Sequence, residues 1–420
     1  MKKKIIFLFM FLFTLSFLSM NLPTEASKNN NGKGNTKTTE EQYFEVSGTK
    51  TLPPGKAKKH VIEEPVTEEP TTEEPVTEEP VTEEPVIVEP SPDETVPPSD
   101  EVTSPMVLGF YTKYWQTDLG SYHSLTEFHP YLNTIATATF DFERDGTITG
   151  FMPTEALDFS KQQSVITYAT VQNKFDPITA SQILQDPALR QKAIANMLKL
   201  VQDNGYDGVN INLENMYATD RPYFNQFLSE AVSVFHSNDL PVMVSVPAKT
   251  CDCPSWAWSG TFDFDFIGKS NVDYVQIMSY DQHGSWGQPG PVAGLNWVQT
   301  VLNYATSHIP SEKLLIGIPA YGYDWNTTKG TGHRALTLKQ IQALINERQP
   351  MIQWDSTSQS PYFHYVDEYG DSHVVWFENN TSIALKTELV HSYNLAGVSM
   401  WRMGQETRDF WESIDSVLSR

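Results

Sequence analysis

Cysteine is almost absent from this sequence, with two residues among 420. Cys251 and Cys253 cannot provide a disulfide framework, so packing must hold the fold together. A bond between them would span one intervening residue and be strained, and two thiols alone make a poor metal site. We interpret them as an incidental pair, with a redox role as the minor alternative. Neither a metal site nor a phosphate-binding loop is visible, so we expect no cofactor.

Long hydrophobic runs are absent after the first residues of the chain. Three lysines precede the apolar run 5–20, and the short stretch Thr24-Glu25-Ala26 follows it. Basic, apolar and small-residue parts in this order are typical of a secretory signal peptide. The run is short for a membrane span, which needs roughly 20 apolar residues. The sequence therefore predicts a signal peptide at residues 1–26 and a secreted protein without a stable membrane anchor, with an uncleaved anchor as the alternative.

Basic residues are scarce, and the formal net charge is −23. Residues 60–102 contain fifteen Asp and Glu and no Lys or Arg, while the part from residue 103 onward has 33 acidic and 19 basic residues. An acidic surface of this kind argues against a nucleic acid as ligand. It suits an extracellular protein that acts on a neutral substrate.

Residues 27–104 form a linker of two compositions. A Lys-rich stretch is followed by the repeat Glu-Glu-Pro-Val-Thr, which recurs through residues 63–85. Dense proline with like charges cannot build a packed core. We expect a disordered, extended spacer, with cell-wall spanning or cation binding as the alternative interpretations.

From residue 105 to the C-terminus, short apolar runs alternate with helical patterns, which indicates an α/β fold. The expected strands are 107–111, 134–142, 164–170, 208–214, 241–246, 272–280, 314–318 and 395–401. Eight strands with helices between them predict a (β/α)8 TIM barrel. A doubly wound sheet is the alternative, but no Gly-rich dinucleotide turn follows the first strand. Residues 326–378, with a helix at 336–348 and a hairpin, are expected to form a small α+β insertion between the seventh and eighth strands.

Polar residues mark the end of the fourth strand. Alternation places Asn210, Asn212 and Glu214 on one face and the apolar residues between them on the other. The apolar side must face the helices, so the polar side faces the barrel lumen. Buried polar groups are costly unless they are paired or functional. A structural amide network is one reading, but the position of Glu214 at the mouth favours catalysis.

Two further strand ends carry candidate residues. Gln276, Met278 and Tyr280 share a face of the sixth strand, and Tyr280 is expected to project into the mouth. Trp401 ends the eighth strand and would form an apolar floor for a sugar ring. Each residue alone is weak evidence, because Tyr and Trp are usually packing residues.

These motifs together resemble glycoside hydrolase family 18. The family signature Asp-x-x-Asp-x-Asp-x-Glu is matched by Asp207, Asn210, Asn212 and Glu214, and Met278-Ser-Tyr280-Asp281 is similar to its Met-x-Tyr-Asp motif. Trp401 resembles the Trp of the last strand. Residues 246–250, 258–260 and 317–325 look most like the branch of bacterial spore cortex-lytic N-acetylglucosaminidases, which cleave peptidoglycan.

The resemblance implies a mechanism with one protein acid. Most retaining glycosidases use two carboxylates about 5 Å apart, whereas in this family the 2-acetamido carbonyl of the substrate is the nucleophile. Glu214 would protonate the leaving oxygen and then take a proton from water. Tyr280 would hold the acetamido oxygen and Asn212 the acetamido N–H. The residues expected to contact substrate are Asp207, Asn210, Tyr111, Gln276, Met278, Asp281 and Trp401.

The sequence departs from the family signature at Asn210 and Asn212, where the family has Asp. The Asn212 amide can still accept a hydrogen bond, but it cannot carry a negative charge or raise the pKa of Glu214 by repulsion. We therefore expect a slower enzyme or a changed pH optimum. A second departure is that no small wall-binding repeats, usual in the spore-lytic branch, are visible.

The expected function is hydrolysis of β-1,4 bonds after N-acetylglucosamine in peptidoglycan or related glycans, by a secreted monomer that is wall- or spore-associated. A chitinase or an endo-β-N-acetylglucosaminidase is the alternative within enzymes. A glycan-binding protein on an inactivated barrel is the alternative outside them, and retention of Glu214 argues against it.

Overall fold

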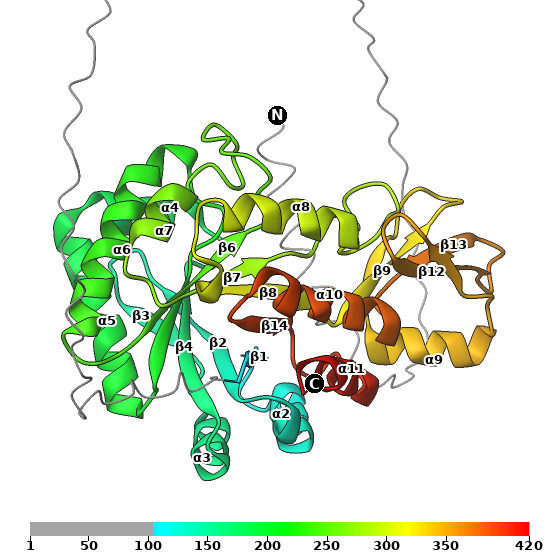
Figure 1. Cartoon of the computed structure of the whole chain (residues 1–420), viewed down its shortest axis with the longest axis horizontal. Helices are drawn as coiled ribbons and strands as arrows, with labels where there is room; N and C mark the ends of the chain where they lie inside the picture. The colour runs from blue at the N-terminus through cyan, green and yellow to red at the C-terminus, as the bar shows by residue number, and fades with distance from the viewer. Residues whose placement is uncertain (1–103, 420) are drawn as a thin grey trace, which may run out of the picture. The chain divides into compact units, whose positions relative to one another are not determined.

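The computed structural model describes residues 104–419; the predicted signal peptide and nearly all of the predicted linker lie outside them. Eight parallel strands form a closed ring, because β1 pairs with both the second and the last strand of the series. In ring order they are β1 (Met106–Thr112), β2 (Thr134–Phe142), β4 (Ile166–Gln172), β5 (Gly208–Asn212), β6 (Val242–Pro247), β7 (Tyr274–Met278), β8 (Leu314–Pro319) and β14 (Gly397–Trp401). The predicted (β/α)8 barrel is confirmed (Figure 1).

Helices lie between the strands and cover the barrel. They are α2 (Gly120–Phe128), α3 (Thr154–Gln163), α4 (Pro177–Gln185), α5 (Pro187–Asn204), α6 (Arg221–His236), α7 (Phe264–Lys269), α8 (Leu295–Thr306), α10 (Asn380–Tyr393) and α11 (Arg408–Leu418). Short 3-10 helices η1 (His129–Tyr131), η2 (Ala218–Asp220) and η3 (Ser311–Lys313) and the strand β3 (Ile148–Gly150), antiparallel to β2, complete this part. No helix within residues 104–419 is long and apolar enough to cross a membrane.

Local sequence explains where the helices begin and end. The Asp186 side chain accepts hydrogen bonds from two backbone N–H groups in the first turn of α5, and Pro187 occupies the position after this cap. Gly205 ends the helix with a left-handed backbone (φ 66°), which glycine adopts without a side-chain clash. On α6, buried residues at helical spacing, including Phe224, Phe227 and Phe235, pack against the barrel.

Two cores follow from the alternation of side chains along the strands. The larger core lies between strands and helices and contains Val209, Ile211 and Leu213 of the β5 region. The smaller core lies on the other face of the strands, inside the barrel, and includes Leu108 and Phe110 of β1. A side chain therefore reaches the lumen or the helix layer according to its parity in the strand.

The segment between β8 and β14 folds as a five-stranded antiparallel sheet with one helix. In sheet order its strands are β10 (Arg334–Thr337), β9 (Tyr321–Asn326), β13 (Ser372–Trp376), β12 (Ser360–Val366) and β11 (Gln353–Asp355), and the helix is α9 (Leu338–Arg348). Figure 1 shows these elements together, in yellow and orange, on one side of the barrel. The predicted α+β insertion is confirmed, but it begins at Tyr321, earlier than the expected boundary at 326.

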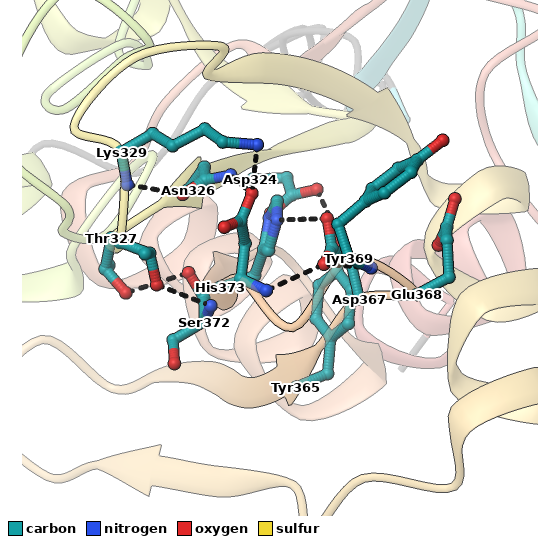
Figure 2. A network of polar contacts seen from close by, with 12 residues as sticks. Asp324, Asn326, Thr327, Lys329, Tyr365, Asp367, Glu368, Tyr369, Ser372 and His373 are labelled. Carbon is teal, nitrogen blue, oxygen red and sulfur yellow. Dashed lines mark hydrogen bonds and ion pairs between the residues drawn. The ribbon is translucent and has the colours of Figure 1, made fainter.

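The two faces of β9 have different environments. Tyr321, Tyr323 and Trp325 belong to an apolar cluster that also packs against Trp401 at the barrel mouth. Asp324 points the other way, into the polar network of Figure 2, where it accepts hydrogen bonds from the His373 ring at 2.8 Å and the Tyr365 hydroxyl at 2.8 Å. This network joins β9, β12 and β13, so the sheet holds the three aromatic residues of β9 in fixed positions.

Candidate active site

The polar residues of the β5 region lie on the lumen face, as the alternation predicts. Asn210 and Asn212 are buried, and Glu214 follows β5 at its carboxyl end, partly exposed at the mouth. The intervening apolar residues belong to the helix-facing core. In a (β/α)8 barrel the carboxyl ends of the strands form the active-site face, so Glu214 lies on the face where enzymes of this fold bind their substrates.

Hydrogen bonds hold Glu214 by its side chain and by its backbone. The Asn212 side-chain amide donates to Glu214 Oε1 at 3.0 Å. The Asn173 side chain accepts from the Glu214 backbone N–H at 2.9 Å and donates to the Glu214 carbonyl at 2.8 Å. Asn173 was not among the predicted residues. Its only sequence signal is its place directly after a barrel strand, β4.

The pKa of Glu214 is raised from 4.5 to about 7. Burial is the largest cause, and the negative charge of Asp281 adds to it, while the hydrogen bond from Asn212 opposes the shift. A carboxyl group with a pKa near neutrality can both give and take a proton under ordinary conditions. The site therefore contains one group suited to general acid and base catalysis.

Asp281, the neighbouring carboxylate, is held by the insertion. The hydroxyls of Tyr321 and Tyr323 donate to Asp281 Oδ1 at 2.6 and 2.8 Å. Burial raises the pKa of Asp281, and these two donors lower it. Asp281 thus acts as a fixed carboxylate close to Glu214. The predicted substrate contact by Asp281 stays a prediction.

Tyr280 lies beside both acids and depends on a glycine in the next strand. A Cβ at Gly317 would stand 2.8 Å from the Tyr280 ring and 2.5 Å from the Ile277 carbonyl oxygen, so a larger residue would displace the ring. Burial raises the pKa of Tyr280 well above its usual value, and the charges of Glu214 and Asp281 add to this. Tyr280 therefore remains a protonated hydroxyl at neutral pH and can donate a hydrogen bond.

Asn210 and Gln276 lie deeper in the lumen. Asn210 donates to Thr170 Oγ1 and accepts from Ser245 Oγ, each at 3.2 Å. Gln276 donates to Ser399 Oγ at 3.0 Å. Both amides are completely buried. Asn210 is therefore part of a buried amide and hydroxyl network, whereas the Gln276 side-chain oxygen is buried without a hydrogen-bond partner within residues 104–419. The predicted substrate contacts of these two residues stay predictions.

Trp401 and Met278 lie at the ends of β14 and β7 and are partly exposed. The Trp401 ring packs at 5.4 Å from the Phe110 ring and also touches the cluster that contains Tyr321 and Tyr323. Trp401 therefore forms an apolar wall of the mouth next to Tyr280. Phe110 was missed because every residue of β1 is buried and apolar residues occur on both faces.

The structure places two of the predicted contact residues away from the lumen. Asp207 precedes β5 at the amino-terminal end of the barrel, opposite Glu214, and its Oδ2 accepts from the backbone N–H and hydroxyl of Thr167 at 2.8 and 2.9 Å. Tyr111 is fully buried in the core between strands and helices, not in the lumen. Asp207 thus holds the start of β4, and the Tyr111 hydroxyl is buried without a hydrogen-bond partner within residues 104–419. The predicted substrate contacts of both residues stay predictions.

The interpretation of the cysteines is also corrected. Cys251 and Cys253 are joined by a disulfide with Cα atoms 5.6 Å apart. They lie in the loop between β6 and α7, at the same end of the barrel as Glu214.

Taken together, the fold and the site define a class of enzyme. A (β/α)8 barrel that presents a desolvated carboxylic acid, a neutral tyrosine hydroxyl and an indole wall at its mouth has the components of a glycosidase that works by general acid catalysis.

Comparison with known proteins identifies the glycosidase family to which the chain belongs. The model of Glycosyl hydrolases family 18 matches residues 106–406, and the chain belongs to this family. The uncharacterized glycosylase YvbX of Bacillus subtilis is 35% identical over 312 residues, covering 73% of this chain and 90% of that protein. The cortical fragment-lytic enzyme of Bacillus subtilis is 29% identical over 292 residues, 68% of each chain. A chitinase from Chromobacterium violaceum aligns with a TM-score of 0.71 at 32% identity, covering 76% of this chain and all of that one.

Proposed function

We propose that this glycosidase hydrolyses β-1,4 bonds after N-acetylglucosamine in peptidoglycan or a related glycan, with retention of configuration and with the substrate acetamide as nucleophile. The observation that carries the proposal is the state of the two carboxylates. Glu214 has a pKa of about 7, whereas Asp281 Oδ1 is engaged by two tyrosine hydroxyls. A fixed carboxylate of this kind supports the site electrostatically and leaves the nucleophilic role to the substrate.

The roles of the site residues follow from their protonation and partners. Glu214, protonated near neutral pH, gives its proton to the leaving oxygen and then takes one from the attacking water. Tyr280 donates its hydroxyl hydrogen to the acetamido oxygen and directs it at the anomeric carbon. Asn212 Oδ1 is buried and has no hydrogen-bond partner within residues 104–419, so it is available to accept from the acetamido N–H.

The names of the relatives bear on the substrate. One relative is a cortical fragment-lytic enzyme, which favours wall or cortex peptidoglycan. Another is a chitinase, which makes chitin the second candidate. The N-terminal sequence supports export to the wall. Fractionation of cells that express the full chain tests this: we expect the protein outside the cytoplasm.

The function is tested by digesting peptidoglycan, spore cortex and chitin oligomers with the full chain and identifying the products by mass spectrometry. We expect fragments from wall material with N-acetylglucosamine at the reducing end, initially in the β configuration by NMR. Glu214→Gln should abolish them, whereas Glu312→Gln, in η3 at the opposite end of the barrel, should leave them. Cleavage of chitin alone would select the second candidate, and binding of every glycan without turnover would contradict catalysis.

The acetamide step has its own test. Chitin oligomers whose acetamido groups have been removed keep the glycosidic bonds but lose the nucleophile. We expect no cleavage next to a deacetylated sugar. Equal cleavage of acetylated and deacetylated oligomers, or an initial product in the α configuration, would contradict the proposed mechanism.

A further inference from the structure

The loop between β6 and α7, residues 248–263, presents two tryptophans to solvent. The residues Trp256 and Trp258 are 54% and 46% exposed. Burial of a large aromatic side chain is stabilising, so two exposed tryptophans on one loop indicate a binding surface rather than a packing element. The loop follows a barrel strand and therefore lies at the mouth.

The loop has a rigid frame despite this exposure. Arg221, at the start of α6, donates to both carboxylate oxygens of Asp252 at 2.7 and 2.9 Å and to Asp263 Oδ2 at 3.1 Å, so it ties the beginning of the loop to its end. The buried Lys249 ammonium donates to the Phe262 carbonyl at 2.5 Å and to Asp252 at 3.2 Å. The disulfide encloses Asp252 between its two cysteines.

The frame is tight around the tryptophans as well. Gly260 donates its backbone N–H to the Trp256 carbonyl at 2.9 Å, and a Cβ at Gly260 would stand 2.4 Å from the Pro254 carbonyl. A loop whose backbone is held in this way loses little entropy when it binds a ligand, because it is ordered beforehand.

The loop is continuous with the catalytic segment. The Trp258 ring packs at 5.4 Å from the Phe175 ring, and the Phe175 carbonyl accepts from the Asn215 side chain at 3.0 Å. Asn215 is the residue after Glu214. The Thr261 hydroxyl donates to the Tyr217 carbonyl at 3.0 Å, in the same β5–α6 connection. A polymer bound at Glu214 and extending in this direction therefore meets Trp258.

We propose that the disulfide-closed loop binds sugar units of the glycan beyond the cleaved bond, with Trp256 and Trp258 as the platforms and the Cys251–Cys253 disulfide as the brace that holds them. The occupant is a glycan because the C–H face of a pyranose ring packs on an exposed indole, and because the surface continues into a glycosidase site. This inference rests on the proposed function. It adds the residues that make the enzyme prefer long chains to short ones.

The test compares a long substrate with a short one. For Trp258→Ala we expect the KM for uncross-linked peptidoglycan strands or chitohexaose to rise about tenfold, the size of a lost aromatic contact. The kcat should stay the same, and so should KM for an aryl chitobioside. Trp354→Ala, an exposed tryptophan on the edge strand β11 of the inserted sheet, is the matched control and should change neither value. An equal change for long and short substrates, or no change for either, would overturn the inference.

The brace is tested separately. Cys251→Ser with Cys253→Ser, and the wild type treated with dithiothreitol, should each raise KM for the long substrate without changing the aryl chitobioside reaction. Unchanged KM in both preparations would refute the role of the disulfide. Circular dichroism of the double variant verifies that the barrel is folded, and the dithiothreitol arm tests the brace without any substitution.

A binding measurement separates this inference from the catalytic proposal. The inactive Glu214→Gln chain is titrated with chitohexaose and with chitobiose by calorimetry, with and without Trp258→Ala. If Trp258→Ala lowers the affinity for chitohexaose but not for chitobiose, the result supports glycan binding by the loop even if no substrate is turned over. Failure of the wild type to cleave any glycan would count against the proposed function only, and equal affinity for both sugars in both proteins would count against the loop.

Discussion

Glu214 should lower the stability of the folded chain as the pH rises towards neutrality. Its pKa is about 7 in the folded protein and 4.5 as the unperturbed reference. The folded state therefore binds the proton more tightly than the unfolded state, and the stabilisation it provides is complete below pH 4.5 and lost as pH rises towards 7. At 1.36 kcal/mol per unit, the loss amounts to about 3 kcal/mol.

Glu214→Gln removes this titration and keeps the size of the side chain. We expect the free energy of unfolding of the variant, relative to wild type, to increase between pH 4.5 and 7 and to level off above that range. The increase should approach 3 kcal/mol, roughly a quarter of the stability of an ordinary domain. The same variant should lose glycosidase activity, so the acid is kept at a cost in stability.

Urea unfolding of wild type and variant, followed by tryptophan fluorescence from pH 4 to 9, measures the difference. Glu312→Gln controls for the general loss of a carboxylate and should give a pH dependence parallel to wild type. If the Glu214→Gln and wild-type curves are also parallel, the carboxyl group is not desolvated as the structure indicates, and the argument for its acid role fails.

Three further substitutions test the surroundings of the acid. Asn212→Asp replaces a donor to Glu214 with a like charge, which raises the pKa of Glu214, so the alkaline limb of kcat/KM should move to higher pH. Gly317→Ala forces the Tyr280 ring away and overpacks the barrel; we expect kcat to fall at least tenfold and unfolding free energy to fall by about 1–3 kcal/mol. Asn173→Ala leaves the backbone N–H and C=O of Glu214 without their side-chain partner, and urea unfolding should show a loss of about 1–3 kcal/mol together with a lower kcat. An unshifted alkaline limb in Asn212→Asp would contradict the effect of residue 212 on the pKa of Glu214. A wild-type kcat in Gly317→Ala or Asn173→Ala would contradict the role of that residue in positioning Tyr280 or Glu214.

The barrel and the position of Glu214 at its mouth could be predicted because their signals are local. The spacing of Asn210, Asn212 and Glu214 in a strand fixes their common face, and apolar residues between them identify the side that meets the helices. The strand and helix patterns recur often enough to define the fold. No long-range information was needed for either step.

The remaining features depend on contacts between distant segments. Every residue of β1 is buried, so alternation could not show that Phe110 faces the lumen and Tyr111 the helices. Asp207 matches a family motif, yet its hydrogen bonds are to Thr167, a partner that only strand pairing reveals. The disulfide forms in a loop shaped by Arg221 and Asp252, which are separated by 31 residues.

The clearest long-range effect is the pair of hydrogen bonds by which Tyr321 and Tyr323 of the insertion hold Asp281 close to Glu214. The family signature has Asp where this chain has Asn212, so a charge that would raise the pKa of Glu214 is missing. Asp281, which matches the family's Met-x-Tyr-Asp motif, still supplies a like charge, and Tyr321 and Tyr323 lower its pKa and thereby help to keep it ionised. The inserted sheet therefore influences the pKa of Glu214, the proposed catalytic acid, through one carboxylate.

This coupling predicts the sign of a pH shift. In Tyr321→Phe with Tyr323→Phe, Asp281 loses two hydrogen-bond donors, its pKa rises, and it takes up a proton at higher pH. Glu214 then loses a like charge, its pKa falls, and the alkaline limb of kcat/KM should move to lower pH by up to roughly one unit. Tyr365→Phe, whose hydroxyl instead donates to Asp324 on the other face of the sheet, is the matched control. A limb that stays in place or moves to higher pH in the double variant, with the sheet still folded, would show that Asp281 does not set the acidity of Glu214.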